Sequence, residues 1–248
     1  MAISFDQRDG WIWMNGKFVP WAEATLHVLN HGLHYASSVF EGQRAYNGKI
    51  FKLEEHTERL RFSANMLGFD LPYSDEELNK ANREAIEKNN IVNGYLRPVA
   101  WRGSETMAIS AQNATLNVAI AWWEWPSYFN KESLEKGLKL TMADWQRPAP
   151  TSAPVHAKAA GLYMICTLSK HKAEAAGFDD ALMLDYRGYI AECTGANIFF
   201  ITKNGELHTP EADCFLNGIT RRTVIDLARD KGIKVVERHI KPEELSDF

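Results

Sequence analysis

The sequence has little cysteine: it holds three among 248 residues, and none of them forms a C-x-x-C pair. A disulfide framework or a zinc ribbon is therefore not expected. Positive charge is not in excess, because the net charge is −4 at pH 7, and this argues against nucleic acid or an anionic membrane as the main partner. The start lacks the basic and apolar regions of a signal peptide, and the most apolar strand, 118–123, is too short to cross a bilayer. We expect a soluble cytoplasmic protein.

What is present is typical of a globular enzyme, with 45% hydrophobic and 24% charged residues, and the length suffices for one large or two smaller domains. Three Asn-Gly pairs each favour a two-residue type I′ hairpin. The pairs predict these strand pairings: 12–14 with 17–19, 43–46 with 49–52, and 198–201 with 206–208.

Helices are expected between these hairpins. Apolar residues at three- and four-residue intervals predict a helix over 53–67, with Gly68 as its stop. Ser74 and Glu77 predict a capping box that opens a helix over 75–89. Two further helices are expected over 161–176 and 220–231, each followed by glycine. Hairpins plus helices, twice over, indicate an α+β fold in two domains. We place a smaller N-terminal domain at 1–125, a linker at 126–135 and a larger domain at 136–248.

Three motifs in the second half of the chain bear chemistry together. Lys158 lies among alanines and a glycine, which leave room for a flat ring to approach the backbone. Glu192 follows an apolar strand and a turn. Gly218-Ile219-Thr220 opens an amphipathic helix, whose N-terminal N–H groups and dipole favour a phosphate dianion. Together these motifs have the parts that hold pyridoxal 5′-phosphate (PLP). They offer an amine that can condense with the PLP aldehyde, a carboxylate that can pair with its ring nitrogen and a site for its phosphate.

Each of these residues also has an ordinary structural interpretation. Taken alone, Lys158 would be interpreted as a surface lysine at the start of a helix, and Glu192 as a charge at the end of a strand. Asp185 is a weaker candidate than Glu192 for the partner of the ring nitrogen. Thr220 alone would read as a helix cap. Arg59 lies on the first amphipathic helix and offers a guanidinium clamp for the phosphate, although a solvated arginine is the default. The coincidence of three motifs favours the cofactor site.

A metal site is the competing interpretation of one other cluster. His27, His31 and His34 have ligand-like spacing. No carboxylate lies within the cluster, no H-E-x-x-H is present, and Asn30 and Gly32 interrupt a helix there. We therefore expect turn and packing roles for these histidines and no metal.

With these residues in view, the chain resembles the branched-chain amino-acid aminotransferases, which have the class IV (D-alanine aminotransferase-like) PLP fold. The resemblance rests on the segment 31–42, on Tyr95-Leu96-Arg97-Pro98 and on the three motifs above, in the same order and spacing. It implies fold type IV, with hairpin-rich sheets packed against helices in two domains and the cofactor between them.

The resemblance also implies a role for each site residue. Lys158 is the catalytic lysine bound to the cofactor aldehyde, Tyr163 bonds the phenolic oxygen of the cofactor, and Glu192 partners the ring nitrogen. The cofactor-binding residues are Arg59, Lys158, Tyr163, Glu192, Gly218, Ile219 and Thr220. The substrate-binding residues are Tyr35, Phe40, Tyr95, Arg97, Met107, Ile109 and Trp125, most of which form an apolar wall with Tyr163. Tyr95 helps to bind the α-carboxylate, and Arg97 receives the side-chain carboxylate of glutamate.

The reaction expected from this resemblance is transfer of the amino group of L-leucine, L-isoleucine or L-valine to 2-oxoglutarate by a ping-pong mechanism. The resemblance further implies a homodimer, with a trimer of dimers as an alternative, and small-molecule substrates only. Other class IV enzymes stay open as alternatives: D-amino-acid and (R)-amine transaminases, and aminodeoxychorismate lyase. Relatives continue for a few dozen residues past Phe248, with a turn that completes the phosphate site, so we interpret the sequence as cut short; a non-catalytic PLP-fold protein is the remaining alternative.

Overall fold

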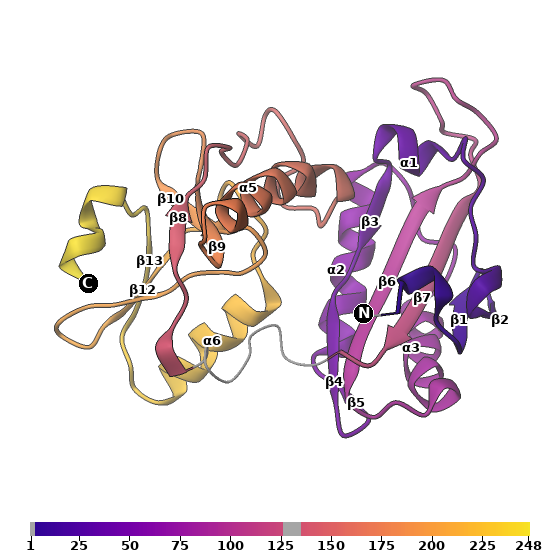
Figure 1. Ribbon diagram of the computed structural model, residues 1–248, viewed down its shortest axis with the longest axis horizontal. Coiled ribbons are helices and arrows are strands. Elements are labelled where there is room, and N and C mark those ends of the chain that lie inside the picture. Colours follow the sequence, from indigo (N-terminus) through magenta and orange to yellow (C-terminus); the bar gives the residue numbers. More distant parts are fainter. Residues whose placement is uncertain (1–2, 126–134) are drawn as a thin grey trace. The chain divides into compact units, whose positions relative to one another are not determined.

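A computed structural model describes residues 3–125 and 135–248 of the chain (Figure 1). These residues form two compact units. The first unit contains residues 3–125 together with Ala157–Gly161, and the second contains residues 135–156 and Leu162–Phe248. The segment that carries Lys158 thus packs with the N-terminal unit, although it follows the predicted linker in sequence. That linker, 126–135, lies almost wholly outside the described residues.

The first unit is built on a seven-stranded antiparallel sheet in the order β2-β1-β7-β6-β4-β5, with β3 also paired to β6. Its strands are β1 (Trp11–Met14), β2 (Lys17–Pro20), β3 (Ser38–Phe40), β4 (Gln43–Tyr46), β5 (Lys49–Ile50), β6 (Gly94–Arg102) and β7 (Leu116–Trp123). Since β3 and β4 both pair with β6, the two residues between them, Glu41 and Gly42, lie against the middle of the sheet.

Two of the predicted hairpins are present with the predicted register. Ile12 pairs with Val19 and Met14 with Lys17, while Tyr46 pairs with Lys49. Asn15 and Gly16 have φ of 50° and 90°, and Asn47 and Gly48 have φ of 50° and 75°, as a type I′ turn requires. The predicted strand 49–52 is too long, because Lys52 adopts a left-handed conformation that begins the next helix.

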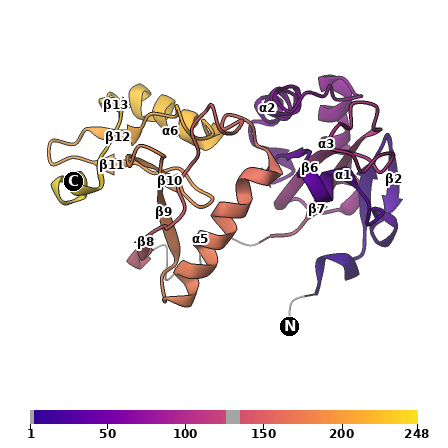
Figure 2. The same ribbon diagram turned by 90° about the horizontal axis from the view of Figure 1, so that it is seen from above.

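Helices α2 (Leu53–Met66) and α3 (Asp75–Asn89) cover one face of this sheet (Figures 1 and 2). The predicted capping box is confirmed: the Ser74 side chain accepts from the Glu77 N–H, and the Glu77 carboxylate accepts from the Ser74 N–H. Apolar side chains from both helices and from β6 and β7 form one core: Leu60, Ala64, Leu78, Ala85, Leu96, Ala100, Val118 and Ile120. The short elements of this unit are η1 (Phe5–Gln7), η2 (Trp21–Glu23) and α1 (His31–Tyr35).

Side chains along β6 point alternately to the two faces of the sheet, and this decides which of them are available for a site. Leu96 and Ala100 belong to the core beneath the helices. Because successive side chains of a strand point to opposite faces, Tyr95, Arg97 and Trp101 project from the other face of the sheet. Tyr95 packs there in a second cluster with Trp21 and Trp123.

The second unit contains two small sheets. One has the order β10-β9-β8 and the other β11-β12-β13, and each combines a parallel with an antiparallel pair. The strands are β8 (Leu140–Met142), β9 (Asp180–Leu184), β10 (Ile190–Cys193), β11 (Phe200–Ile201), β12 (Leu207–Pro210) and β13 (Val235–Arg238). The helical elements are η3 (Ala160–Tyr163), α5 (Met164–Ala175), α6 (Ile219–Asp230) and η4 (Pro242–Asp247). This mixture of helices and hairpin-rich sheets confirms the predicted α+β fold.

Two local predictions in this part of the chain were wrong. The segment 161–176 is not one helix, because it begins as the 3₁₀ turn η3 and becomes α-helical only at Met164. The third hairpin has no type I′ turn. Its strands β11 and β12 do pair, but Phe200 pairs with His208, one residue out of the register that a two-residue turn at Asn204-Gly205 requires. The loop closes with Thr202 N–H bonded to the Glu206 carbonyl, and Gly205 alone of the Asn-Gly pair has positive φ. No helix within residues 3–125 and 135–248 is both long and apolar enough to cross a membrane.

Candidate active site

The backbone around Lys158 is built into the first unit. The Lys158 N–H donates to the Ser63 hydroxyl on α2 at 2.9 Å, and its carbonyl accepts from the Phe40 N–H at 3.1 Å. The next residue, Ala159, forms an isolated antiparallel bridge with Val39. These bonds fix the direction in which the half-buried Lys158 side chain leaves the backbone, and this is not how a solvated surface lysine is held.

The ring of Phe40 brings two cationic groups together. The Lys158 Nζ lies 5.0 Å from the ring centroid, and the Arg97 guanidinium carbon lies 4.6 Å from it. Arg97 also donates from Nη2 to the Tyr95 hydroxyl at 2.9 Å. Tyr95 in turn packs against Trp125, with ring centroids 5.1 Å apart. Five of the predicted site residues are therefore neighbours within one unit.

Arg59 carries a partner that the sequence analysis did not assign. Its Nε and Nη2 each donate to one oxygen of Glu41 at 2.7 Å, and His56 Nδ1 lies 2.7 Å from the second oxygen. Burial raises the pKa of Glu41, but the hydrogen bonds from Arg59 and His56 outweigh it and lower that pKa to about 2. Glu41 is thus a buried anion at neutral pH, and Arg59 is held by it.

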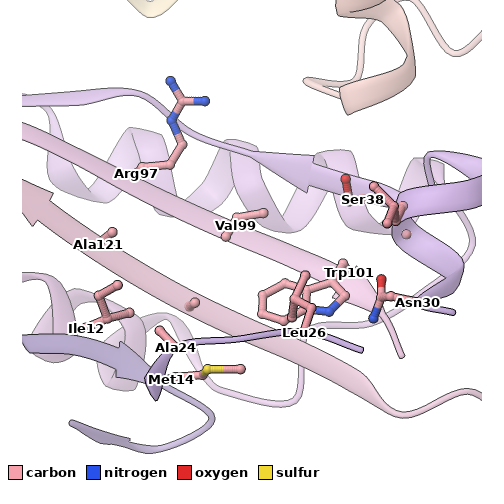
Figure 3. Close-up of a pocket in the computed structure, with 13 residues that line it drawn as sticks. Ile12, Met14, Ala24, Leu26, Asn30, Ser38, Arg97, Val99, Trp101 and Ala121 are labelled. Carbon is pink, nitrogen blue, oxygen red and sulfur yellow. The ribbon is translucent and has the colours of Figure 1, made fainter. Parts of the chain in front are cut away.

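A mainly apolar cavity of about 390 Å³ lies on the sheet face opposite the two helices (Figure 3). Arg97 and Ile12 stand toward one end of it, and Trp101 and Asn30 toward the other. The predicted apolar wall does not coincide with this cavity, because its lining contains Arg97 but none of the residues expected to form that wall.

Three of those predicted residues lie elsewhere in the first unit. The Tyr35 hydroxyl donates to the Met107 carbonyl at 2.9 Å. Ile109 is 87% exposed, so it packs against little of the rest of this chain.

Glu192 stands on β10 at a break in the strand register. Its Oε1 lies 3.4 Å from Nε of the buried Arg147, and its Oε2 accepts from Asn197 at 3.5 Å. The competitor Asp185 accepts four shorter bonds from Arg187 and Tyr189, between 2.6 and 3.1 Å. These bonds commit Asp185 to the turn that follows β9, so it is a poor candidate for the partner of a ring nitrogen.

The predicted phosphate turn opens α6 as expected, one residue earlier than Thr220. Gly218 is the N-cap residue, and within the described residues no side chain caps this helix. A Cβ at Gly218 would lie 2.0 Å from Asn197 Oδ1, so a larger residue would require the Asn197 side chain to move. Ile219 is buried and Thr220 is exposed. The first N–H groups of the helix are thus left for an anion, and the interpretation of Thr220 as a cap is wrong.

The remaining predicted groups have simple positions. Tyr163 ends η3, directly before α5. His31 contacts the Ser37 hydroxyl at 2.6 Å and the Ala108 carbonyl at 3.1 Å, which is a packing role.

Within the described residues, one cluster has metal-like geometry: Asp185, Asp213 and Cys214. The Arg187 guanidinium already stands among its ligand atoms, 2.6 to 3.2 Å from each residue.

Sequence reasoning missed Glu41, Ser63 and Arg147. A usable signal existed for one of these residues, since Ser63 follows Arg59 by four positions and therefore lies on the same face of a predicted helix. Glu41 and Arg147 lie in segments without a helical period, and their partners come from distant parts of the chain.

Comparison with known proteins identifies the family of the chain. The amino-transferase class IV family model matches residues 38–248. The probable branched-chain-amino-acid aminotransferase of Rickettsia felis is 49% identical over 246 residues, 99% of this chain and 83% of the relative. A T.th. branched-chain amino acid aminotransferase with pyridoxamine 5′-phosphate superposes with a TM-score of 0.92 at 40% identity, covering 96% of this chain and 79% of that one.

A second structure of the T.th. enzyme, complexed with N-(5′-phosphopyridoxyl)-L-glutamate, has a TM-score of 0.89 at 39% identity over 96% of this chain and 79% of that chain. The order of Lys158, Glu192 and Gly218 along this chain, the α+β fold and the family match over most of its length lead to one conclusion: the chain belongs to the class IV aminotransferases.

Proposed function

We propose that this protein is a PLP-dependent branched-chain amino-acid transaminase, which moves the amino group of L-leucine, L-isoleucine or L-valine to 2-oxoglutarate. The observation that carries the proposal is the Phe40 ring with Lys158 Nζ at 5.0 Å and the Arg97 guanidinium at 4.6 Å. A reactive amine, an apolar surface and a carboxylate-binding cation are thereby neighbours. A ping-pong enzyme needs this combination, since one site must accept an aliphatic and an acidic side chain in turn.

The residues present fit PLP. Arg59 and the start of α6, which no described side chain caps, offer donors for a phosphate dianion, and Glu192 offers a carboxylate for a ring nitrogen. When bound, PLP supplies an electron sink for the electrons released at the substrate Cα. The T.th. relative binds pyridoxamine 5′-phosphate, which supports the same cofactor here.

The chain's own residues then have the following roles. With PLP present, Lys158 Nζ would hold the cofactor through its aldehyde and would move a proton to and from the substrate Cα. Glu192 would hold the proton on the ring nitrogen, Tyr163 would bond the phenolic oxygen, and Arg59, Ile219 and Thr220 would bind the phosphate. Tyr95 orients the α-carboxylate, and Arg97 pairs with the side-chain carboxylate of glutamate. The T.th. complex with a pyridoxyl derivative of glutamate supports glutamate as a substrate.

Apolar burial accounts for the second substrate class. Each buried CH₂ contributes about 0.8 kcal/mol, so an aliphatic side chain gains from Phe40 and Trp125 without an ionic partner. We also propose that the protein is cytoplasmic and forms a homo-oligomer, either a dimer or a hexamer. Light scattering during size-exclusion chromatography measures the molar mass and so distinguishes these two oligomeric states.

A donor panel tests the proposed function. The protein, PLP and 2-oxoglutarate are incubated with single amino acids, and glutamate formation is followed. We expect turnover with L-leucine, L-isoleucine and L-valine and far less with D-amino acids or (R)-amines. Borohydride reduction followed by peptide mapping is expected to place the cofactor on Lys158. An adduct on another residue, or pyruvate release from aminodeoxychorismate in place of glutamate formation, would refute the proposal.

A further inference from the structure

Glu41 is a fully buried carboxylate to which the proposed reaction gives no part. It lies between β3 and β4, and its backbone N–H donates to the Pro98 carbonyl at 2.8 Å. Its side chain is 0% exposed. Burial of an unpaired carboxylate is costly, so this anion persists only because its partners are close and well oriented.

Those partners come from one face of α2. Arg59 donates to both Glu41 oxygens at 2.7 Å, in the bidentate geometry that fixes a guanidinium in its plane. His56, three positions earlier on α2, approaches the second oxygen at 2.7 Å. Three short contacts at a buried carboxylate leave the Arg59 side chain little rotational freedom.

Glu41 occupies only one edge of the guanidinium. It takes Nε–H and one hydrogen of Nη2, whereas an arginine has five N–H donors. Within residues 3–125 and 135–248, Arg59 Nη1 has no hydrogen bond. The free edge, Nη1 with the second hydrogen of Nη2, has the fork geometry that suits a phosphate.

The same helix also holds the lysine segment. Ser63, four positions after Arg59 on α2, accepts from the Lys158 N–H at 2.9 Å. The orientation of Arg59 relative to Lys158 is therefore set inside one unit, by Glu41 on one side and Ser63 on the other. The proposed function assigns the phosphate of a cofactor joined to Lys158 to Arg59, and the free edge has the donors for it.

We infer that Glu41 is a positioning residue: it holds Arg59 with its free edge toward the cofactor phosphate and so sets the preference for the phosphorylated cofactor over pyridoxal. This inference rests on the proposed function and deepens it. Glu41 itself does not touch the cofactor. Its own negative charge opposes phosphate binding, so its contribution comes from orientation and not from attraction.

That distinction dictates the test variant. Glu41→Asp keeps the charge but withdraws the carboxylate by one methylene, so it changes geometry alone. Dissociation constants of PLP and of pyridoxal are measured by absorbance titration of the cofactor-free protein. We expect Glu41→Asp to weaken PLP about tenfold, the effect of disturbing one charged hydrogen bond, and to leave pyridoxal within about twofold.

Two further variants complete the experiment. In an Arg59→Met background, Glu41→Asp is expected to change PLP affinity no further. In that variant the guanidinium through which Glu41 acts on the phosphate is absent. Glu55→Gln, at a partly exposed carboxylate of α2 paired with Lys52, is the control, and its PLP affinity is expected to equal that of the wild type. If Glu41→Asp does not fold, Glu41→Gln replaces it. Glutamine also removes the charge that opposes phosphate, which by itself would favour PLP, so a loss of preference for PLP over pyridoxal in this variant again comes from orientation.

The outcomes separate this inference from the proposed function. Equal losses for PLP and pyridoxal mean that Glu41 supports only the fold, and unchanged PLP affinity means that Arg59 needs no orientation; either result overturns the inference. A wild-type protein that binds PLP no better than pyridoxal, or that gives no adduct at Lys158, overturns the proposed function and this inference with it.

Discussion

The hydroxyl of Tyr95 occupies the space that a side chain at Gly42 would need: a Cβ built there lies 2.1 Å from the Tyr95 oxygen. The Tyr95 ring cannot easily withdraw, because it packs against Trp123 and Trp125 with ring centroids 5.0 and 5.1 Å away. Gly42 therefore allows Tyr95 to reach Arg97.

Gly42→Ala is expected to displace the Tyr95 hydroxyl and break its bond to Arg97. We expect a loss of about 1 to 3 kcal/mol in the free energy of unfolding, as for overpacking of a filled site, and a higher KM for amino acids. Urea unfolding and steady-state kinetics measure both effects. Gly195→Ala is the stability control, since a Cβ there meets nothing within 4 Å. A stable variant with unchanged KM would contradict this account.

Arg97→Ala is expected to discriminate between the two substrate classes. Loss of a charged pair with the glutamate side chain costs about 2 kcal/mol, or about thirtyfold in kcat/KM for glutamate and 2-oxoglutarate. Leucine has no carboxylate on its side chain and should lose much less. Arg83→Ala, which removes an exposed arginine paired with Glu54, serves as the control. Equal losses for leucine and glutamate would refute the role of Arg97.

Ser63→Ala is expected to loosen the segment that carries the reactive lysine. It leaves the Lys158 N–H without its 2.9 Å acceptor, at a cost of about 1 to 2 kcal/mol in the free energy of unfolding, and should lower kcat. The matched control is Ser169→Ala. Ser169 is also buried, but its hydroxyl has no hydrogen-bond partner among the described residues. If both variants lose the same stability, the Ser63 bond contributes nothing specific.

Acid should destabilise the protein in part through Glu41. Burial raises the pKa of this group, but the bonds from Arg59 and His56 outweigh burial and lower the pKa from 4.5 to about 2. A pKa that is lower in the folded state gives stability that is fully present above about pH 4.5 and is lost as the pH falls toward 2, on the order of 3 kcal/mol.

Glu41→Gln should remove that part of the acid dependence. Unfolding free energies at pH 3 and pH 7 measure it: the difference between the two is expected to shrink in Glu41→Gln and to persist in Glu58→Gln, which changes an exposed carboxylate of the same helix. An unaltered difference in Glu41→Gln would show that the buried anion does not couple folding to protonation in this range.

Predictions that rest on neighbouring residues were accurate. The Asn-Gly turns at 15–16 and 47–48, the capping box of α3 and the glycine stops after α2 and α6 all depend on contacts within a few residues. The third Asn-Gly prediction was wrong because β11 and β12 pair one residue out of the register of a two-residue turn, so the loop between Thr202 and Glu206 contains three residues. The 3₁₀ turn η3 has no periodic signal in the sequence.

The sequence by itself determined helices α2, α3 and α6, two of the hairpins and the order of the candidate site motifs, because local backbone preferences need no distant partner. Only the tertiary structure decided that Lys158 is tied to α2 through Ser63, that Arg59 is held by Glu41, and that Glu192 faces Arg147. These contacts join residues far apart in the chain. Their existence depends on burial, where an unpaired charge is costly, and no short-range pattern records which distant group will pair with it.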